Sequence, residues 1–429
     1  MGMMEVTIII LCFIVFIGVI NERFLHVQSD IALLLFTLCI SVVLMAMDRL
    51  GDGIPFVREL GDFGFESYLL DCVLCFMLFA GASKVNMGKM KQNIKGISLL
   101  ALVTTVVSSA FYGLLFYLMA QLFLGGISIW ICIMLGCIVS PTDPIAATGI
   151  LNKLGLSKNV TSVIENESLF NDGTGVALFV FIKSIICESG ESNFLVVMAK
   201  EIFGAFFVAL VISFILFEFL KLTNDPVKHL LISILDVSLV YMICEHFGFS
   251  GVIASVICGM FFAYRMNGIE RKRMVVDPHD LYHIFWEVVD TILNAVLFVM
   301  IGVSVLDVTF SPYIFALIPI SIVCVVISRY AGVGLSSVFI GRSIPSSYSL
   351  SEFVLLMTWS ALKGGLSLAL AMSTKEFLPE DIYHIVMNVT YITIFFTVIV
   401  QGLTIKMGYK KIEKHKAIRL QNKGRRIER

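Results

Sequence analysis

Long apolar segments separated by short polar connections run along almost the whole chain of 429 residues. Each segment is long enough to cross a hydrocarbon core of about 30 Å as an α-helix that rises about 1.5 Å per residue. Hydrophobic residues make up 58% of the chain and charged residues only 15%, which is not the composition of an ordinary soluble protein. The pattern predicts an all-α polytopic membrane protein with about thirteen transmembrane helices, at residues 5–21, 31–47, 66–83, 97–121, 127–150, 158–185, 197–221, 228–246, 249–266, 283–304, 313–341, 350–373 and 384–407.

Lys and Arg residues are distributed unevenly between alternate connections. If the N-terminus lies outside, the outside connections hold only Arg49, Arg58 and Lys375, whereas every inside connection carries basic residues. Residues 408–429 form a short tail with nine basic residues, which also falls inside. The positive-inside rule therefore predicts an odd number of spans, with the N-terminus outside and the C-terminus cytoplasmic. The short loops and tail favour a prokaryotic plasma membrane.

The stretch ENESLFNDGTG, residues 165–175, places acidic side chains inside a predicted transmembrane helix. Ionisable groups at membrane depth are costly and are candidates for function. On a helix, Ser168 lies one turn before Asp172 on the same face, and Glu165 lies about one further turn back. Glu167 is offset from Asp172 by about 140°. Carboxylates on two different faces of one helix predict two different partners.

The preceding span is interrupted by prolines in the stretch CIVSPTDPIAATGI. Pro141 and Pro144 flank Thr142 and Asp143, and two prolines so close together unwind a helix. Unwound backbone at membrane depth is tolerated only inside protein or along a water-filled cavity. Freed carbonyls, a hydroxyl and a carboxylate are hard oxygen ligands that suit a small alkali cation. The alternative is a structural kink at which Asp143 caps a half-helix.

A second interruption lies in the stretch MTWSALKGGLSLALAMS, where Lys363 is followed by Gly364 and Gly365. Broken segments at corresponding positions in two halves are typical of secondary transporters built from inverted repeats. If the chain consists of six spans, one linking span and six further spans, the spans 127–150 and 350–373 occupy the same position in the two repeats. We therefore expect inverted six-helix repeats whose two breaks cross near the midplane, one carrying an anion and the other a cation.

Arg329 is a further cation within a predicted span, in the stretch CVVISRYAGV. A buried guanidinium needs an acidic partner, and Glu167 is available because it is turned away from Asp172. A pair between Glu167 and Arg329 would leave Asp172 free to exchange a cation for a proton. The alternative is that Arg329 extends to a lipid headgroup.

These motifs resemble the monovalent cation:proton antiporter family, in particular its sodium/proton exchanger branch with an Asn-Asp motif. The resemblance runs from about residue 66 to residue 406. It is carried by an ordered series of matches: Ser140-Pro-Thr-Asp-Pro144, Glu167-Ser-Leu-Phe-Asn-Asp-Gly173, Tyr241 with Glu245 and Ser250-Gly251, Phe285-Trp286-Glu287 with Leu293-Asn294 and Phe298 to Gly302, Ser328-Arg329, and Gln401-Gly402-Leu403-Thr404.

The resemblance implies an ion-binding and proton-binding site made by a small set of residues: Asp143, Thr142, Glu167, Ser168 and Asp172. Transported Na⁺ would bind to Asp143, Asp172, Thr142 and Ser168, while Asn171, Arg329 and Lys363 would support the site. One position departs from the family, because Lys363 stands where an Arg is usual. Lysine keeps the charge but loses the planar fork of arginine, which affects ion preference and pH dependence more than the fold.

The resemblance also implies a homodimer with two structural parts within a transmembrane exchanger domain, residues 1–407. Residues 1–83 and 228–304 would form a dimerisation part, and residues 97–185 and 313–407 a moving core that translocates the ion. Residues 408–429 would be a cytoplasmic tail. The Asn-Asp motif implies electroneutral exchange of one cation for one proton.

The residues and the resemblance together predict a secondary antiporter that exchanges Na⁺ or Li⁺ for H⁺ by alternating access. Two alternatives stay open: a K⁺/H⁺ antiporter of the same fold, and a membrane sensor that has lost transport. No enzyme activity is expected, since no convincing nucleophile–base pattern occurs at membrane depth. The expected partners are monovalent cations, protons, the lipid bilayer and a second copy of the chain, with no cofactor and no nucleic acid.

Overall fold

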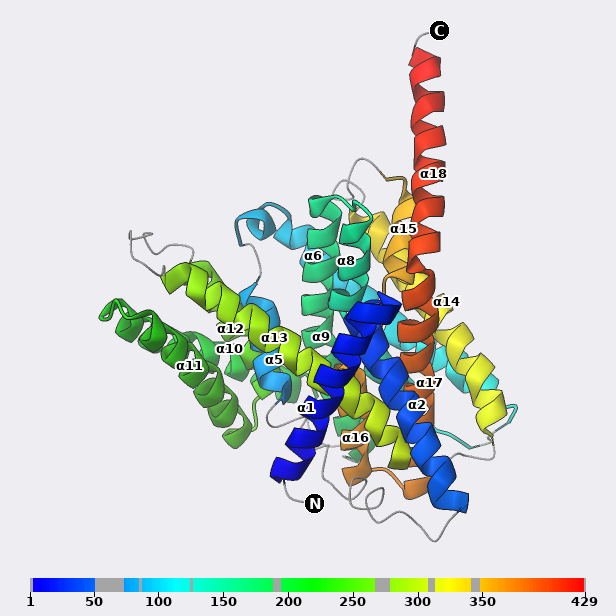
Figure 1. Ribbon diagram of the computed structural model, residues 1–429, viewed down its shortest axis with the longest axis horizontal. Coiled ribbons are helices and arrows are strands. Elements are labelled where there is room, and N and C mark those ends of the chain that lie inside the picture. Colours follow the sequence, from blue (N-terminus) through cyan, green and yellow to red (C-terminus); the bar gives the residue numbers. More distant parts are fainter. Residues whose placement is uncertain are drawn as a thin grey trace.

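The computed structural model describes residues 3–50, 73–84, 87–123, 126–187, 194–266, 278–307, 313–340 and 348–427, and nearly all of them are helical (Figure 1). The α-helices are α1 Met3–Ile20, α2 Ser29–Leu50, α5 Leu74–Ser83, α6 Met87–Ala120, α7 Ile129–Val139, α8 Pro144–Lys153, α9 Lys158–Cys187, α10 Phe194–Lys221, α11 Pro226–His246, α12 Gly251–Met266, α13 Pro278–Val303, α14 Ile314–Ile340, α15 Leu350–Trp359, α16 Gly365–Met372, α17 Glu380–Phe395 and α18 Gly402–Ile427. Short π-helical turns are η1 Asn21–Leu25 and η5 Phe396–Gln401, and short 3₁₀ turns are η3 Ser304–Asp307 and η4 Ser373–Glu376.

Among these described residues, nine helical segments are long and apolar enough to cross a membrane, and four shorter apolar helices accompany them. Each segment predicted from the sequence overlaps one of them, and the predicted spans 127–150 and 350–373 continue as the short helices α8 and α16. The start of the predicted span 66–83 lies outside the described residues. The polytopic all-α fold is confirmed, while the number of crossings and the inverted repeat stay predictions.

The helices pack in two groups that meet at α9. Helices α5, α11, α12 and α13 pack against one another, with α10 against α11 and α12, and α1 and α2 against α13. Helices α6, α7, α9 and α14 form the second group, together with α15, α16 and α17. Figure 1 shows α10, α11 and α12 on one side of α9, with α14, α17 and α18 on the other. The division into a dimerisation part and a moving core stays a prediction, and α10 belongs to neither predicted part.

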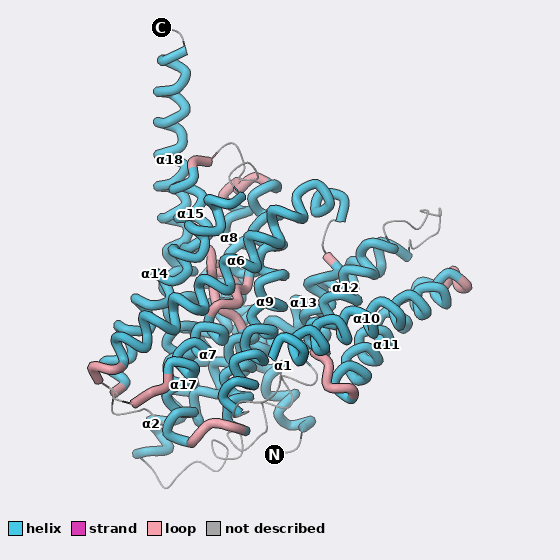
Figure 2. Tube along the Cα trace, turned by 180° about the vertical axis from the view of Figure 1, so that it is seen from behind, coloured by secondary structure: helices cyan, strands magenta, loops and turns pink. Residues whose placement is uncertain are grey.

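Two interrupted helices cross inside the bundle, as the sequence predicts. The chain is unwound between α7 and α8 and again between α15 and α16, and these segments are loops in the middle of the bundle (Figure 2). The Asp143 N–H donates to the Leu362 carbonyl at 2.8 Å, which makes an isolated antiparallel bridge between the two breaks. Prolines open the first break and glycines the second.

The predicted start of the tail, after residue 407, lies within a continuous helix. Helix α18 begins at Gly402 and continues to Ile427, beyond the rest of the bundle (Figure 1). Apolar residues continue at helical spacing past residue 407, and Tyr409 and Ile412 are buried in a cluster with Phe353 of α15. The first part of the tail is therefore a packed helix.

Candidate ion-binding site

The acidic face of α9 borders a cavity of about 790 Å³ between the two groups of helices. Asp172 lines this cavity, as do Thr142 and Asp143 from the break between α7 and α8. Glu165 lines it as well, about two turns from Asp172 on the same face of α9. The face predicted from the sequence is therefore the face that borders the cavity.

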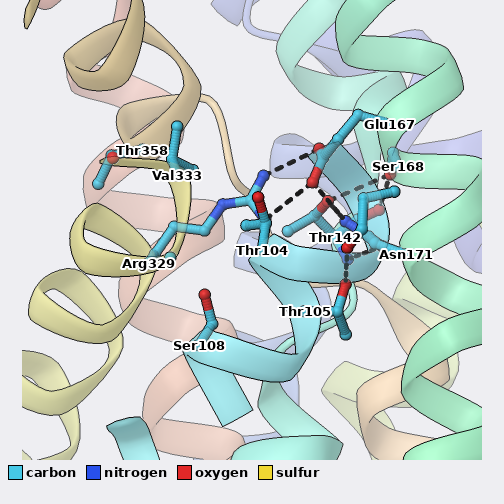
Figure 3. Close-up of polar contacts among 12 residues, drawn as sticks. Thr104, Thr105, Ser108, Thr142, Glu167, Ser168, Asn171, Arg329, Val333 and Thr358 are labelled. Atoms are coloured by element: carbon cyan, nitrogen blue, oxygen red, sulfur yellow. Dashed lines mark hydrogen bonds and ion pairs between the residues drawn. The ribbon is translucent and has the colours of Figure 1, made fainter. Parts of the chain in front are cut away.

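The unwound segment is held onto α9 by a compact hydrogen-bond network (Figure 3). Asn171 accepts from the Thr142 backbone N–H at 3.1 Å and donates from Nδ2 to the Thr142 hydroxyl at 2.6 Å. The Thr142 hydroxyl donates to Ser168 Oγ at 3.2 Å, and the Ser168 hydroxyl donates to the Thr142 carbonyl. These bonds replace the helical partners that the prolines remove, and they fix the backbone next to Asp143.

Glu167 points away from the cavity and forms an ion pair with Arg329 of α14. Arg329 Nη1 donates to Glu167 Oε1 at 3.0 Å, and Nη2 donates to Oε2 at 2.9 Å. The two residues are only 1% and 4% exposed. The pair predicted from the helix geometry is confirmed, and Arg329 does not extend to the membrane surface. Figure 3 shows Glu167 between Arg329 on one side and Asn171 on the other.

Lys363 occupies the second break and is 2% exposed. Its ammonium donates to the Ser140 carbonyl at 3.0 Å. Ser140 caps the C-terminal end of α7, where carbonyls lose their intrahelical donors and the helix dipole is negative. The expected arrangement of an anion on one break and a cation on the other is thus present, with Lys363 bonded to the end of α7.

Glycines allow the close approach of the backbone at two points of the crossing. A Cβ atom at Gly364 would lie 3.0 Å from Asp143 Cβ and 3.1 Å from its Oδ2. A Cβ atom at Gly175 would lie 2.5 Å from Pro141 Cγ. A larger side chain at either position would force the first break to shift, which explains the glycine on the second break and the glycine on α9 where each of them meets the first break.

The structure brings together most of the predicted site, but not all of it at the cavity wall. Thr142, Asp143 and Asp172 line the cavity, whereas Ser168 and Glu167 do not. Ser168 lies behind Thr142, to which it is bonded. The described residues thus group the predicted ion ligands around one cavity, with Glu167 engaged by Arg329.

The sequence did not predict a second ion pair at the cavity. Lys84, directly after the end of α5, forms an ion pair with Asp290 of α13, and Asn294 Nδ2 donates to Asp290 Oδ1 at 3.0 Å. The spacing of Asp290 and Asn294, one helical turn apart, was the signal available.

Acidic side chains outnumber basic ones along the cavity wall. The charged residues that line it are Asp143, Glu165, Asp172, Glu287 and Asp290, with Lys84 and Lys158. A cavity lined mainly by one sign of charge concentrates ions of the opposite sign. The wall therefore favours cations.

Comparison with known proteins agrees with this geometry. The family model described as the transmembrane sodium/hydrogen exchanger matches residues 60–411. The chain belongs to the sodium/hydrogen exchanger family. The resemblance inferred from the motifs is thereby confirmed, and the family is one of multi-pass membrane transporters.

Individual relatives cover nearly the same length. The chain is 28% identical over 399 residues to the Na⁺/H⁺ antiporter NhaP of Pseudomonas aeruginosa, covering 90% of this chain and 91% of the relative. It is 28% identical over 355 residues to the Na⁺/H⁺ antiporter NhaH of Halobacillus dabanensis, covering 81% and 84%. The solved structure of the sodium proton antiporter MjNhaP1 of Methanocaldococcus jannaschii superposes with a TM-score of 0.75 at 21% identity, covering 96% of this chain and 99% of that structure. The antiporter fold is therefore shared.

Proposed function

We propose that this protein exchanges Na⁺ or Li⁺ for H⁺ across the cell membrane by alternating access. The observation that carries the proposal is that Asp172 on α9 and Asp143 on the unwound break line one cavity. Thr142 would add a neutral oxygen ligand, and Ser168 would hold Thr142 in place from behind. The relatives are named as Na⁺/H⁺ antiporters, which supports Na⁺ and H⁺ as the two transported ions.

Coupling follows from the competition of a cation and a proton for the same carboxylates. A site that holds either one is neutralised, whereas an empty anionic site carries the cost of buried charge. If only the neutralised site crosses between the two sides, one ion must move inward for each that moves outward. Glu167 would not take part in this exchange, because Arg329 already neutralises it.

One exchangeable charge on α9 supports electroneutral exchange. Asn171, next to Asp172, donates to Glu167 Oε1 at 3.3 Å and bonds Thr142, so it acts as a structural amide where a second carboxylate could bind a proton. Asp172 then exchanges one cation for one proton, with Asp143 as a fixed ligand. A membrane potential imposed with K⁺ and valinomycin should leave the initial rate unchanged, and a rate that follows the potential would exclude this stoichiometry.

The arrangement of the helices supports an N-terminus outside and a cytoplasmic C-terminus. Helix α1 starts at one end of the bundle and α18 finishes at the other (Figures 1 and 2). Lys84 and Lys158, which line the cavity, belong to connections that the positive-inside rule places inside. The cavity would then open to the cytoplasm of a prokaryotic cell. We further propose a homodimer formed through residues 1–83 and 228–304.

The test is a transport assay in everted membrane vesicles with an acidified lumen and a dye that reports the pH gradient. Addition of Na⁺ or Li⁺ should dissipate the gradient with the wild type and with Glu165→Gln, but not with Asp172→Asn. Glu165→Gln is the matched control, because it removes a carboxylate from the same face of α9 and the same cavity. Activity that persists in Asp172→Asn would refute the proposed site.

Two other outcomes would change the proposed function. Dissipation by K⁺ alone would keep the mechanism and make the protein a K⁺/H⁺ antiporter. If none of Na⁺, Li⁺ and K⁺ dissipates the pH gradient from about pH 6 to 9, in folded protein, the result would favour a sensor that has lost transport. Lys363 would then be the first residue to test as the cause of that loss.

A further inference from the structure

A π-helical turn interrupts the last long helix beside the crossing of the two breaks. Helix α17 ends at Phe395, the turn η5 covers Phe396–Gln401, and α18 begins at Gly402. Such turns are rare, and they are found frequently at functional sites. This one contacts the second break, because the Thr397 hydroxyl oxygen lies 3.1 Å from the Lys363 backbone nitrogen.

Thr397 is the residue of this turn that bonds the break. It is 1% exposed, and its hydroxyl donates to the Ile394 carbonyl at 3.1 Å. The same oxygen accepts from the Lys363 backbone N–H, also at 3.1 Å. Because the chain is unwound at Lys363, this N–H has lost its helical acceptor, and a buried N–H without a partner is costly.

The bond from Lys363 to Thr397 involves the same peptide group that joins the two breaks. The carbonyl of Leu362 accepts from the Asp143 N–H, and the N–H of the same peptide group donates to Thr397. In a planar trans peptide these two groups point in opposite directions. One peptide plane is therefore held from both sides, by Asp143 on one and by Thr397 on the other.

We infer that Thr397 is a positioning residue of the exchange site, acting through the Leu362–Lys363 peptide group on Asp143 and on the Lys363 ammonium. The inference rests on the proposed function of the site. The Lys363 side chain starts from this peptide and ends on the Ser140 carbonyl, so rotation of the peptide would move both its ammonium and the backbone of Asp143.

The same helix provides a matched control. Thr390 lies seven residues before Thr397, is fully buried, and donates to the Val386 carbonyl of its own helix at 2.8 Å. The Thr390 hydroxyl bonds within α17, whereas the Thr397 hydroxyl also joins η5 to the second break. Replacement of either threonine by valine keeps the size and removes the hydroxyl, so a difference between the two variants reports the bond to Lys363.

The first experiment measures Na⁺-dependent exchange by full-length wild type, Thr397→Val, Thr397→Ser and Thr390→Val in everted vesicles. In Thr397→Val, the Na⁺ concentration for half-maximal exchange should rise about tenfold, equivalent to about 1.4 kcal/mol, with a smaller change in the maximal rate. Thr397→Ser and Thr390→Val should stay within about twofold of the wild type. An unchanged Thr397→Val, an equal loss in Thr390→Val, or no rescue by serine would overturn the inference.

Two further measurements separate this inference from the proposed function. Asp172→Asn in the same vesicles tests the exchange site independently of Thr397. Amide hydrogen exchange of the segment containing Lys363 tests the bond without transport: it should be about tenfold faster in Thr397→Val and unchanged in Thr390→Val. Equal protection of this segment in the wild type and in Thr397→Val would overturn the inference even if exchange is observed.

Discussion

The ion pair between Glu167 and Arg329 gives the sharpest prediction for stability. Both side chains are almost fully buried, and both carboxylate oxygens accept from the guanidinium. Within the described part of the chain, Arg329 Nε has no hydrogen-bond partner, so the bonds to Glu167 are its main compensation. Glu167→Gln removes the negative charge to which the guanidinium is bonded and leaves a buried, unpaired cation.

Removal of one partner from a buried ion pair costs about 3–5 kcal/mol. At about 2 °C per kcal/mol for a long chain, the midpoint of thermal unfolding in detergent should fall by about 6–10 °C. The double variant Glu167→Gln/Arg329→Gln should recover much of this loss, because no buried charge remains unpaired and the two amides can bond each other.

Glu165→Gln serves as the control for this experiment. It makes the same chemical change two residues earlier on α9, at an exposed carboxylate, and should change stability by no more than about 0.5 kcal/mol. The reasoning would be refuted if Glu167→Gln unfolded at the same temperature as the wild type. It would also be refuted if the unfolding midpoint of the double variant fell by as much as those of the two single variants added together.

Two further predictions test the crossing and the last helix. Gly364→Ala should reduce Na⁺-dependent exchange, because the added Cβ would force Asp143 to shift by a few tenths of an ångström. Gly81→Ala, which lines the same cavity with open space around it, should exchange like the wild type in the same vesicle assay. Truncation after residue 407 should lower the unfolding midpoint, because it removes the buried side chains of Tyr409 and Ile412, each worth about 1.5–3 kcal/mol. Truncation after residue 419 should leave the midpoint unchanged, and equal midpoints for the two truncations would contradict the packed helix.

The sequence predicted the helices well because their signal is strong and local. Apolar segments, prolines and glycines gave the span of α9 and both breaks to within a few residues. Helical geometry alone separated Glu167 from Asp172, and the ion pair with Arg329 followed from the need to compensate a buried charge. These inferences depend either on the hydrophobicity of many residues together or on the large free-energy cost of a buried charge, so they can be made without coordinates.

The contacts that the sequence could not predict are single bonds between distant segments. The bond from Asp143 to Leu362, the pair of Lys84 with Asp290, and the bond from Lys363 to Thr397 join residues far apart in the chain. Threonine and lysine at these positions carry no local sign of their partner. The extent of α18 was missed for a different reason, because the dense basic charge after residue 407 hides a short apolar stripe.

Helix α18 also offers a direct way to observe the protein at work. It is continuous with the π-helical turn η5 at its start, and further along Arg419 binds Glu352 at the beginning of α15 at 3.0 Å. With 26 residues it is about 39 Å long. A fluorophore attached near its far end, paired with one on α11, would magnify any rotation of the helices around the crossing into a change in distance. Individual molecules could then be followed through each turnover, with no label near the cavity.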